Sequence, residues 1–144
     1  MVLTQKIAIQ MAEQKAGHII NVASIAGKIA TPKTVVYSAT KFAVIGFSNA
    51  LRLELKPVGV HVTTVNPGPI ETAFFDQADP SGNYLANLGS IVLEPNKLAR
   101  TIVKNMIHPK REINRPHIFG AAAKLYTLFP SIGDYMAGSL FNKK

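Results

Sequence analysis

Residues 18–41 read HIINVASIAGKIATPKTVVYSATK, and this stretch decides the fold. It opens with a short apolar run, His18 to Ala23, of the kind that forms a buried parallel strand. Ser24 ends the run, so we expect its hydroxyl at the carboxyl end of that strand. Tyr37 and Lys41 follow in a helical segment. Because residues at i and i+4 share one face of a helix, the phenol and the ammonium can approach the same reacting atom.

The strings IINVASIAG at residues 19–27 and YSATK at residues 37–41 resemble those of the short-chain dehydrogenase/reductase family, classical type. A third element of that family is a Pro-Gly segment after the next strand. Its counterpart here is NPGPIET at residues 66–72. A lone Tyr-x-x-x-Lys would be weak evidence, but the three elements stand in the order that the family has.

The first half of that family's fold has no counterpart in these residues. No two of the ten glycines stand two apart, so the dinucleotide-binding pattern G-x-G-x-x-G cannot be written anywhere in the chain. The resemblance therefore covers the carboxyl-terminal half of such an enzyme, or a little more. A family asparagine that supports proton transfer is expected just before Met1, so we expect these 144 residues alone to be inactive.

The pattern of helices and strands predicts an α/β fold. We expect a partial Rossmann-like parallel sheet of about three strands with flanking helices, without the first half of the doubly wound fold. Residues 1–144 form one domain. The expected strands are His18 to Ala23, Val60 to Val65 and Glu112 to Phe119. The expected helices are residues 2–16, Tyr37 to Lys56 and a helix that opens at Pro95 and ends before Pro109, with a loop from Ser24 to Val36.

Two further segments are predicted from the proline and glycine residues that interrupt helices and strands. Residues 71–89 contain the cluster DPSGN at 79–83, which suits a mobile segment over a site better than another core strand. The resemblance implies that this segment covers the substrate. The tail, residues 120–144, is predicted as two short helices broken by Pro130 and Gly133. The apolar faces of these helices could cover a substrate cleft, pack on a partner subunit or lie at a membrane surface.

The reaction implied is the interconversion of a carbonyl and an alcohol. Reducing a ketone requires a hydride on carbon, which no side chain donates, so a nicotinamide must supply it. Tyr37 can supply the proton, and the cation of Lys41 can stabilise a phenolate. Ser24 would donate a hydrogen bond to the substrate oxygen as negative charge develops there. The catalytic residues predicted are Ser24, Tyr37 and Lys41, of which Ser24 and Tyr37 also bind substrate.

The resemblance implies further contacts with the cofactor. Lys41, beside Tyr37, would hold the nicotinamide ribose, Ile70 and Thr72 would contact the carboxamide, and Pro67 and Gly68 would shape the loop against the ring. The choice between NAD and NADP is left open, because its determinants lie in the first half of the fold.

Composition argues against a disulfide-rich, metal-binding, nucleic-acid-binding or membrane protein. The chain has no cysteine, and its four histidines lack the spacing of a zinc site, so we expect neither disulfides nor a metal. Sixteen Lys and Arg against eight Asp and Glu give a net charge of +8, but they are scattered, so nucleic-acid binding ranks last. With no stretch of 18 apolar residues and no signal-peptide pattern, we expect a cytoplasmic protein without a membrane partner.

Self-association is the alternative to catalysis. Members of the resembled family commonly dimerise through helices equivalent to residues 2–16 and 38–56, so we expect a homo-oligomer. The strand at His18 to Ala23 should also present an unpaired, apolar edge. The alternative function is therefore a truncated, non-catalytic association module.

Overall fold

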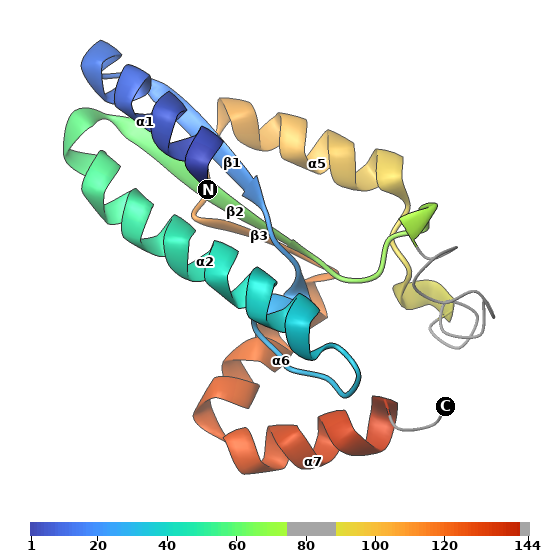
Figure 1. The fold of residues 1–144 in the computed structure, drawn as a ribbon. Coiled ribbons are helices and arrows are strands. Elements are labelled where there is room, and N and C mark those ends of the chain that lie inside the picture. The colour runs from blue at the N-terminus through green and yellow to red at the C-terminus, as the bar shows by residue number, and fades with distance from the viewer. Residues whose placement is uncertain (75–88, 142–144) are drawn as a thin grey trace.

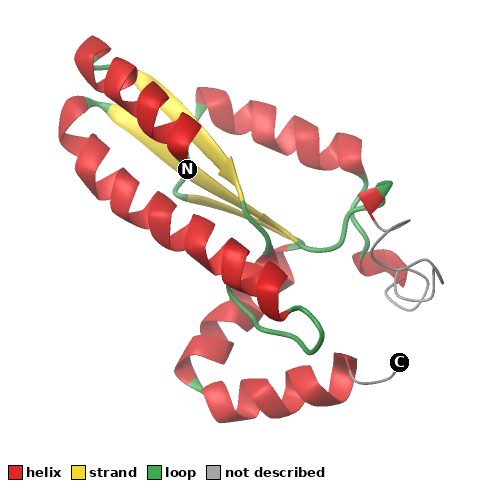
Figure 2. Ribbon diagram, in the orientation of Figure 1, coloured by secondary structure: helices red, strands yellow, loops and turns green. Residues whose placement is uncertain are grey.

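The computed structural model describes residues 1–74 and 89–141, which fold around a parallel sheet of three strands. β1 (Gly17–Val22), β2 (Val60–Pro67) and β3 (Glu112–Arg115) lie side by side in that order. α1 (Val2–Gln14) and α2 (Val35–Leu55) cover one face, and α5 (Pro95–Ile107) covers the other (Figure 1, Figure 2). The predicted α/β class with a partial Rossmann-like sheet is confirmed.

Each face of the sheet has its own hydrophobic core, because successive strand side chains point to opposite faces. Ile19 and Val62 pack with Leu51 and Leu55 of α2. On the other face Val65 and Ile113 pack with Leu98 of α5. The parallel register pairs Gly17 with Val60 and Val22 with Val65, so the carboxyl ends of β1 and β2 are brought to the same edge.

Arg52 fixes the far end of α2 to the sheet. Its Nε donates to the Val62 carbonyl at 2.8 Å, and its Nη2 donates to Thr64 Oγ1 at 3.0 Å and to the Arg111 carbonyl at 3.2 Å. The ladder between β2 and β3 begins only at Thr64 and Glu112. The guanidinium thus satisfies carbonyls just before the point where the two strands pair.

Several element boundaries differ from the sequence prediction: β1 runs from Gly17 to Val22 rather than from His18 to Ala23, β2 extends to Pro67, and α1 ends at Gln14. The strand expected over Glu112 to Phe119 ends at Arg115, because Pro116 has no N–H for a strand ladder and stands at the N-cap of α6 (His117–Leu128). The loop expected over Ser24 to Val36 contains a 3-10 turn, η1 (Ile25–Gly27), and gives way to α2 two residues early.

The apolar stripes predicted on the helices are only partly buried. On α1, Met11 packs into the core, whereas Leu3 is 74% and Ile7 is 38% exposed, and Ala8 takes the buried position. On α2, Phe42 and Leu53 are exposed. The prediction that α2 is covered on more than one side is wrong for the single chain.

Two short helices follow β3. α6 is succeeded by α7 (Pro130–Phe141), which Pro130 opens. Gly133, expected as a breaker, lies inside α7. The two remaining 3-10 turns are η2 (Lys56–Val58) and η3 (Gly89–Ile91). Most of the expected cover segment, residues 75–88 of 71–89, lies outside the described residues. Within the described ranges, no helix has the length and apolarity needed to cross a bilayer.

A pH-dependent loss of stability is predicted for His18. Burial, followed by the neighbouring His61, lowers the pKa of the His18 imidazole below its ordinary value of 6.5. The unfolded chain therefore takes up this proton first as the pH falls. The contribution of neutral His18 to the free energy of unfolding is complete above about pH 6.5. It is lost as the pH drops from there through the lowered pKa of the folded state. Urea denaturation between about pH 8 and about pH 5 measures it.

The variant His18→Gln should flatten this part of the profile, and His108→Gln, at an exposed position, is the matched control. If His18→Gln and the parent protein lose stability with the same slope, the assignment to His18 is wrong.

Candidate active site

Ser24 is held at the carboxyl end of β1 by two hydrogen bonds. Its Oγ accepts from the Ala26 N–H at 3.1 Å, which caps η1. The same hydroxyl donates to the Pro67 carbonyl at 3.4 Å. This second bond is long for an O–H donor, so the proton is only weakly engaged. Ser24 is 8% exposed.

Tyr37 and Lys41 lie in the first two turns of α2 and share one face. Lys41 Nζ is 5.5 Å from the centroid of the Tyr37 ring, a cation–π contact. Tyr37 is 38% exposed, and its ring centroid lies 6.2 Å from that of Phe74. The phenol is thus accessible to a small molecule, beside a cation.

Gly27 brings the serine and the tyrosine–lysine pair to one place. A Cβ on Gly27 would lie 2.7 Å from both the carbonyl carbon and the carbonyl oxygen of Lys41, and 2.7 Å from Ile45 Cδ1. The turn that follows Ser24 therefore packs directly on the backbone of α2. Only glycine permits this distance, because real Cβ atoms do not approach backbone so closely.

Pro67 ends β2 next to Ser24, and Gly68, Ile70 and Thr72 lie in the turn that follows. The Pro67 carbonyl accepts from Ser24, and Ile70 forms a parallel bridge with Leu93 and packs into the α5 core. Thr72 is exposed, and its Oγ1 donates to the Ile70 carbonyl at 3.4 Å. The end of this turn is therefore open to solvent with a hydroxyl on it.

Gly68 is enclosed from the side of α6. Its N–H donates to the Arg115 carbonyl at 2.7 Å, and a Cβ there would lie 2.7 Å from Cε2 of Phe119. Sequence reasoning missed Gly27, Phe119 and Phe74 as neighbours of the site. Each of these residues contacts a segment that is distant in the sequence. Such a contact produces no characteristic residue spacing from which it could have been predicted.

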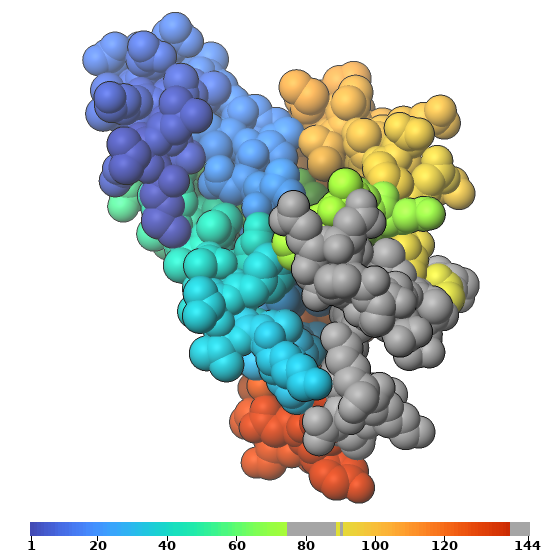
Figure 3. All heavy atoms as spheres, turned by 45° about the vertical axis from the view of Figure 1, so that its right-hand side comes forward, coloured from blue at the N-terminus to red at the C-terminus, as the bar shows by residue number. Residues whose placement is uncertain are grey.

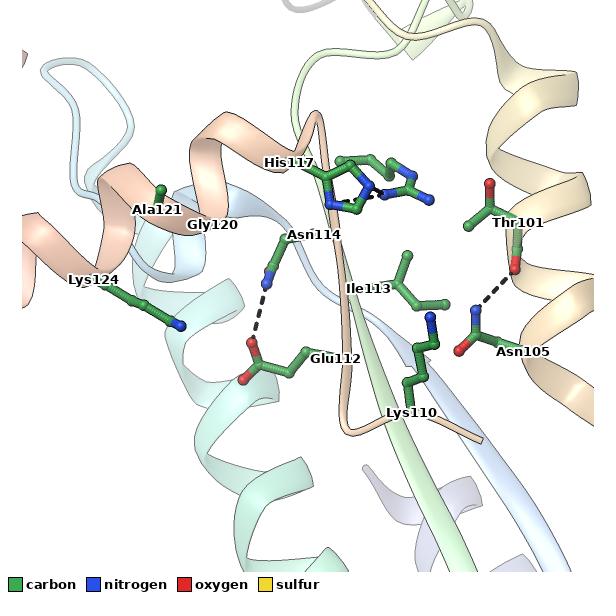
Figure 4. A pocket seen from close by; sticks show the side chains of 11 residues that line it. Thr101, Asn105, Lys110, Glu112, Ile113, Asn114, His117, Gly120, Ala121 and Lys124 are labelled. Atoms are coloured by element: carbon green, nitrogen blue, oxygen red, sulfur yellow. Dashed lines mark hydrogen bonds between the residues drawn. The ribbon is translucent and has the colours of Figure 1, made fainter. Parts of the chain in front are cut away.

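Two cavities of the described chain lie elsewhere. One, of about 310 Å³, opens between α5, β3 and α6, where Asn114 Nδ2 donates to Glu112 Oε2 at 3.3 Å (Figure 4). The other, of about 370 Å³, lies between α2 and α6. Neither is lined by Ser24, Tyr37 or Lys41.

Glu112 reaches both cavities and is ion-paired with Lys28. Partial burial opposes its ionisation, but the hydrogen bond and charge of Lys28, the hydrogen bond of Asn114 and the charge of Arg111 together outweigh burial and lower the pKa of the carboxyl. Among the described residues, no three His, Cys, Asp or Glu side chains gather where they could hold a metal ion.

The fold is a Rossmann-like α/β fold, with a serine at one strand end, a tyrosine–lysine pair on the next helix and a Pro-Gly turn after the next strand. Residues 1–82 match the family model described as short chain dehydrogenase. The chain belongs to the short-chain dehydrogenase/reductase family.

Two curated relatives illustrate the similarity. An uncharacterized oxidoreductase of Staphylococcus aureus (strain USA300) is 37% identical over 100 residues, which span 69% of this chain and 40% of the relative. Dehydrogenase/reductase SDR family member 7B of Xenopus tropicalis is 32% identical over 135 residues, 90% of this chain and 44% of the relative. The chain thus spans less than half the length of these two proteins.

Solved structures show the same fold. The closed form of a serine dehydrogenase complexed with NADP+ has a TM-score of 0.69 at 28% identity, over 77% of this chain and 48% of that one. A short-chain dehydrogenase from Burkholderia cenocepacia in complex with NADP has a TM-score of 0.66 at 23% identity, over 85% of this chain and 47% of that one. The second likeness concerns the fold alone.

The variant Gly27→Ala should destabilise the protein. The added methyl would meet the Lys41 carbonyl group, and backbone cannot move aside cheaply, so we expect a loss of about 1–3 kcal/mol in the free energy of unfolding. Urea denaturation measures this loss. Gly46→Ala, also in α2, is the control, because a Cβ there meets nothing within 4 Å and alanine favours a helix by about 1 kcal/mol. Equal stability of the two variants would contradict the close packing at Gly27.

Proposed function

We propose that this chain forms the catalytic half of a nicotinamide-dependent oxidoreductase that interconverts a carbonyl and an alcohol. The observation that carries the proposal is the pairing of Lys41 with Tyr37 on the open face of α2, 5.5 Å from ammonium to ring centroid. Family membership supports it. The 144 residues alone, which carry no G-x-G-x-x-G pattern, are proposed to be inactive.

Tyr37 is proposed as the group that gives a proton to the substrate oxygen during reduction and takes it back during oxidation. Lys41 stabilises the phenolate by its charge. This role is consistent with an exposed phenol, since the substrate oxygen must reach it.

Ser24 is proposed to polarise the substrate carbonyl. In the structure its hydroxyl donates weakly to Pro67 while accepting from Ala26. The weak bond can be exchanged for one to the substrate oxygen, while the Ala26 N–H continues to hold Oγ in place. The hydroxyl then faces the charge that grows in the transition state.

We propose that a nicotinamide binds at the turn after β2. Thr72 has an exposed hydroxyl there, the backbone of Ile70 is held by its bridge to Leu93, and Gly68 is enclosed by Phe119. When bound, NAD or NADP supplies the hydride. Tyr37 and Lys41 would lie beside its ribose. The proposed substrate is a small carbonyl or alcohol. We propose that it is converted in the cytoplasm.

The decisive variant is Tyr37→Phe in a protein that also carries a dinucleotide-binding half. It removes only the phenolic oxygen, so turnover of carbonyl substrates should fall by about 100-fold or more, with cofactor binding unchanged. Turnover is followed as loss of reduced-nicotinamide absorbance, and binding by fluorescence. Tyr135→Phe, in the exposed tail, is the control. Undiminished turnover in Tyr37→Phe would rule out this role.

A second function, self-association, is favoured by exposed apolar side chains on α1 and α2. These include Leu3, Ile9, Val35, Val36 and Leu53, at 74%, 61%, 81%, 77% and 70% exposure. On one helical layer, such side chains form a face that a second copy can bury. We propose a homodimer through this face, whether or not the chain is active. A thermal shift with NADH or NADPH separates the two functions, because a pure association module gives none.

The double variant Leu3→Ser/Ile9→Ser tests the dimer. Removing two exposed apolar side chains should weaken association at least tenfold in sedimentation velocity, without loss of folding. Leu128→Ser/Ile132→Ser, of matched type and exposure at 69% and 60%, should leave it unchanged. A parent chain that sediments as a monomer at high concentration would remove this proposal.

A further inference from the structure

Glu112 opens β3 and lies across the sheet from Ser24, which follows β1. The strand order is β1-β2-β3, so β2 separates the two residues. The first turns of α2, coloured cyan, lie open at the surface in Figure 3, whereas the Glu112 side chain is only 20% exposed. A largely buried carboxylate needs polar partners, because a charge without them is costly. The partners of Glu112 lead back to Ser24 by two routes.

The first route runs through Lys28. Its ammonium is ion-paired with Glu112, and its side chain is as little exposed as that of the carboxylate. The backbone N–H of Lys28 donates to the Ile25 carbonyl at 2.8 Å and closes η1. Ser24 caps the other end of that turn, where its Oγ accepts from the Ala26 N–H. The ion pair thus ties the turn that orients Ser24 to β3.

The second route runs through two asparagines. Asn114 Nδ2 donates to Glu112 Oε2 at 3.3 Å, and Figure 4 shows these two side chains turned towards each other. Fully buried Asn66 donates from its Nδ2 to Asn114 Oδ1 at 2.9 Å. The next residue is Pro67, whose carbonyl accepts the Ser24 hydroxyl. Glu112 is therefore also connected to the strand end that carries the acceptor of Ser24.

The two routes hold η1 in a direction that Gly27 does not control. The close packing of Gly27 on the Lys41 carbonyl group sets the distance between η1 and α2. The ion pair of Lys28 sets the position of the same turn relative to β2 and β3. Both routes meet at one oxygen, Oε2, while the other, Oε1, lies 3.9 Å from Nε of the more exposed Arg111. A single carboxylate thus joins the turn and the strand end.

We propose that Glu112 is the positioning residue of Ser24. In this role it needs no contact with substrate or cofactor, since it acts through Lys28 and Asn114. The inference rests on the proposed function, in which Ser24 polarises the substrate carbonyl. A neutral side chain at position 112 should loosen η1 and leave the sheet intact. The serine hydroxyl then meets the substrate oxygen less often in the required orientation.

Hydrogen exchange of single amides in the 144-residue chain tests the positioning without any turnover. The Ala26 N–H reports on the Ser24 cap, and the Ala23 N–H, bonded to the Val65 carbonyl at 2.8 Å, reports on the sheet. In Glu112→Gln, which removes the charge and keeps the size, exchange at Ala26 should be at least about fivefold faster. Exchange at Ala23 should change by less than about twofold.

Two further variants complete the exchange experiment. Lys28→Met keeps the apolar stem, removes the ammonium and should accelerate exchange at Ala26 in the same way. Glu94→Gln breaks an exposed ion pair at the start of α5 and is the matched control, with no change expected. Unchanged exchange at Ala26 in Glu112→Gln or in Lys28→Met overturns the proposal. An equal acceleration in the sheet also overturns it, because the pair then only stabilises the fold.

A double-mutant cycle with Ser24→Ala gives the kinetic test, in a protein that also carries a dinucleotide-binding half. Glu112→Gln alone should lower kcat about fivefold to tenfold, with KM and cofactor binding unchanged. In the Ser24→Ala background it should lower kcat less than about twofold, because the residue that it positions is absent. An equal loss in both backgrounds overturns the proposal. Failure of the proposed function shows instead as undiminished turnover in Tyr37→Phe, so the two failures appear in different variants.

Discussion

The candidate site depends on the contact between Gly27 and the backbone of Lys41. Ser24 belongs to the sheet, whereas Tyr37 and Lys41 belong to a helix of 21 residues that packs on it. Such a helix can in principle slide along a sheet. η1 packs so closely on α2 that a Cβ added to Gly27 would lie 2.7 Å from the Lys41 carbonyl group. This close packing prevents the helix from sliding. The height of the phenol above the serine is therefore set by backbone packing.

Arg52 completes this arrangement at the other end of α2. Its bonds to the Val62 carbonyl and to Thr64 tie the helix to β2, as Gly27 ties it to the end of β1. Fully buried Thr64 and Asn66 continue the polar contacts along the sheet, and Asn66 Nδ2 donates to Asn114 Oδ1 at 2.9 Å. Since a buried polar group without a partner costs about 1–3 kcal/mol, these bonds select one register. The register in turn aligns the strand ends that carry the site.

The sequence predicts what depends on local pattern. Apolar runs place β1 and β2, and the interval of four residues places Tyr37 and Lys41 on one face, because these follow from backbone geometry alone. The end of β3 at Arg115 was not predicted, because Ile118 and Phe119 suit a strand as well as a helix and Pro116 alone marks the break. The roles of Gly27, Phe119 and Arg52 are set by contacts across distant segments. A glycine in a loop gives the same sequence signal whether it faces solvent or a helix backbone.

The surfaces left open by this chain differ in what can satisfy them. β1 is an edge strand in the described sheet, and its outer N–H and C=O groups can be satisfied fully only by another strand or by water. The backbone groups of α1 and α2 are already hydrogen-bonded within each helix. Their apolar faces therefore need only apolar contact, which a second layer of helices can supply.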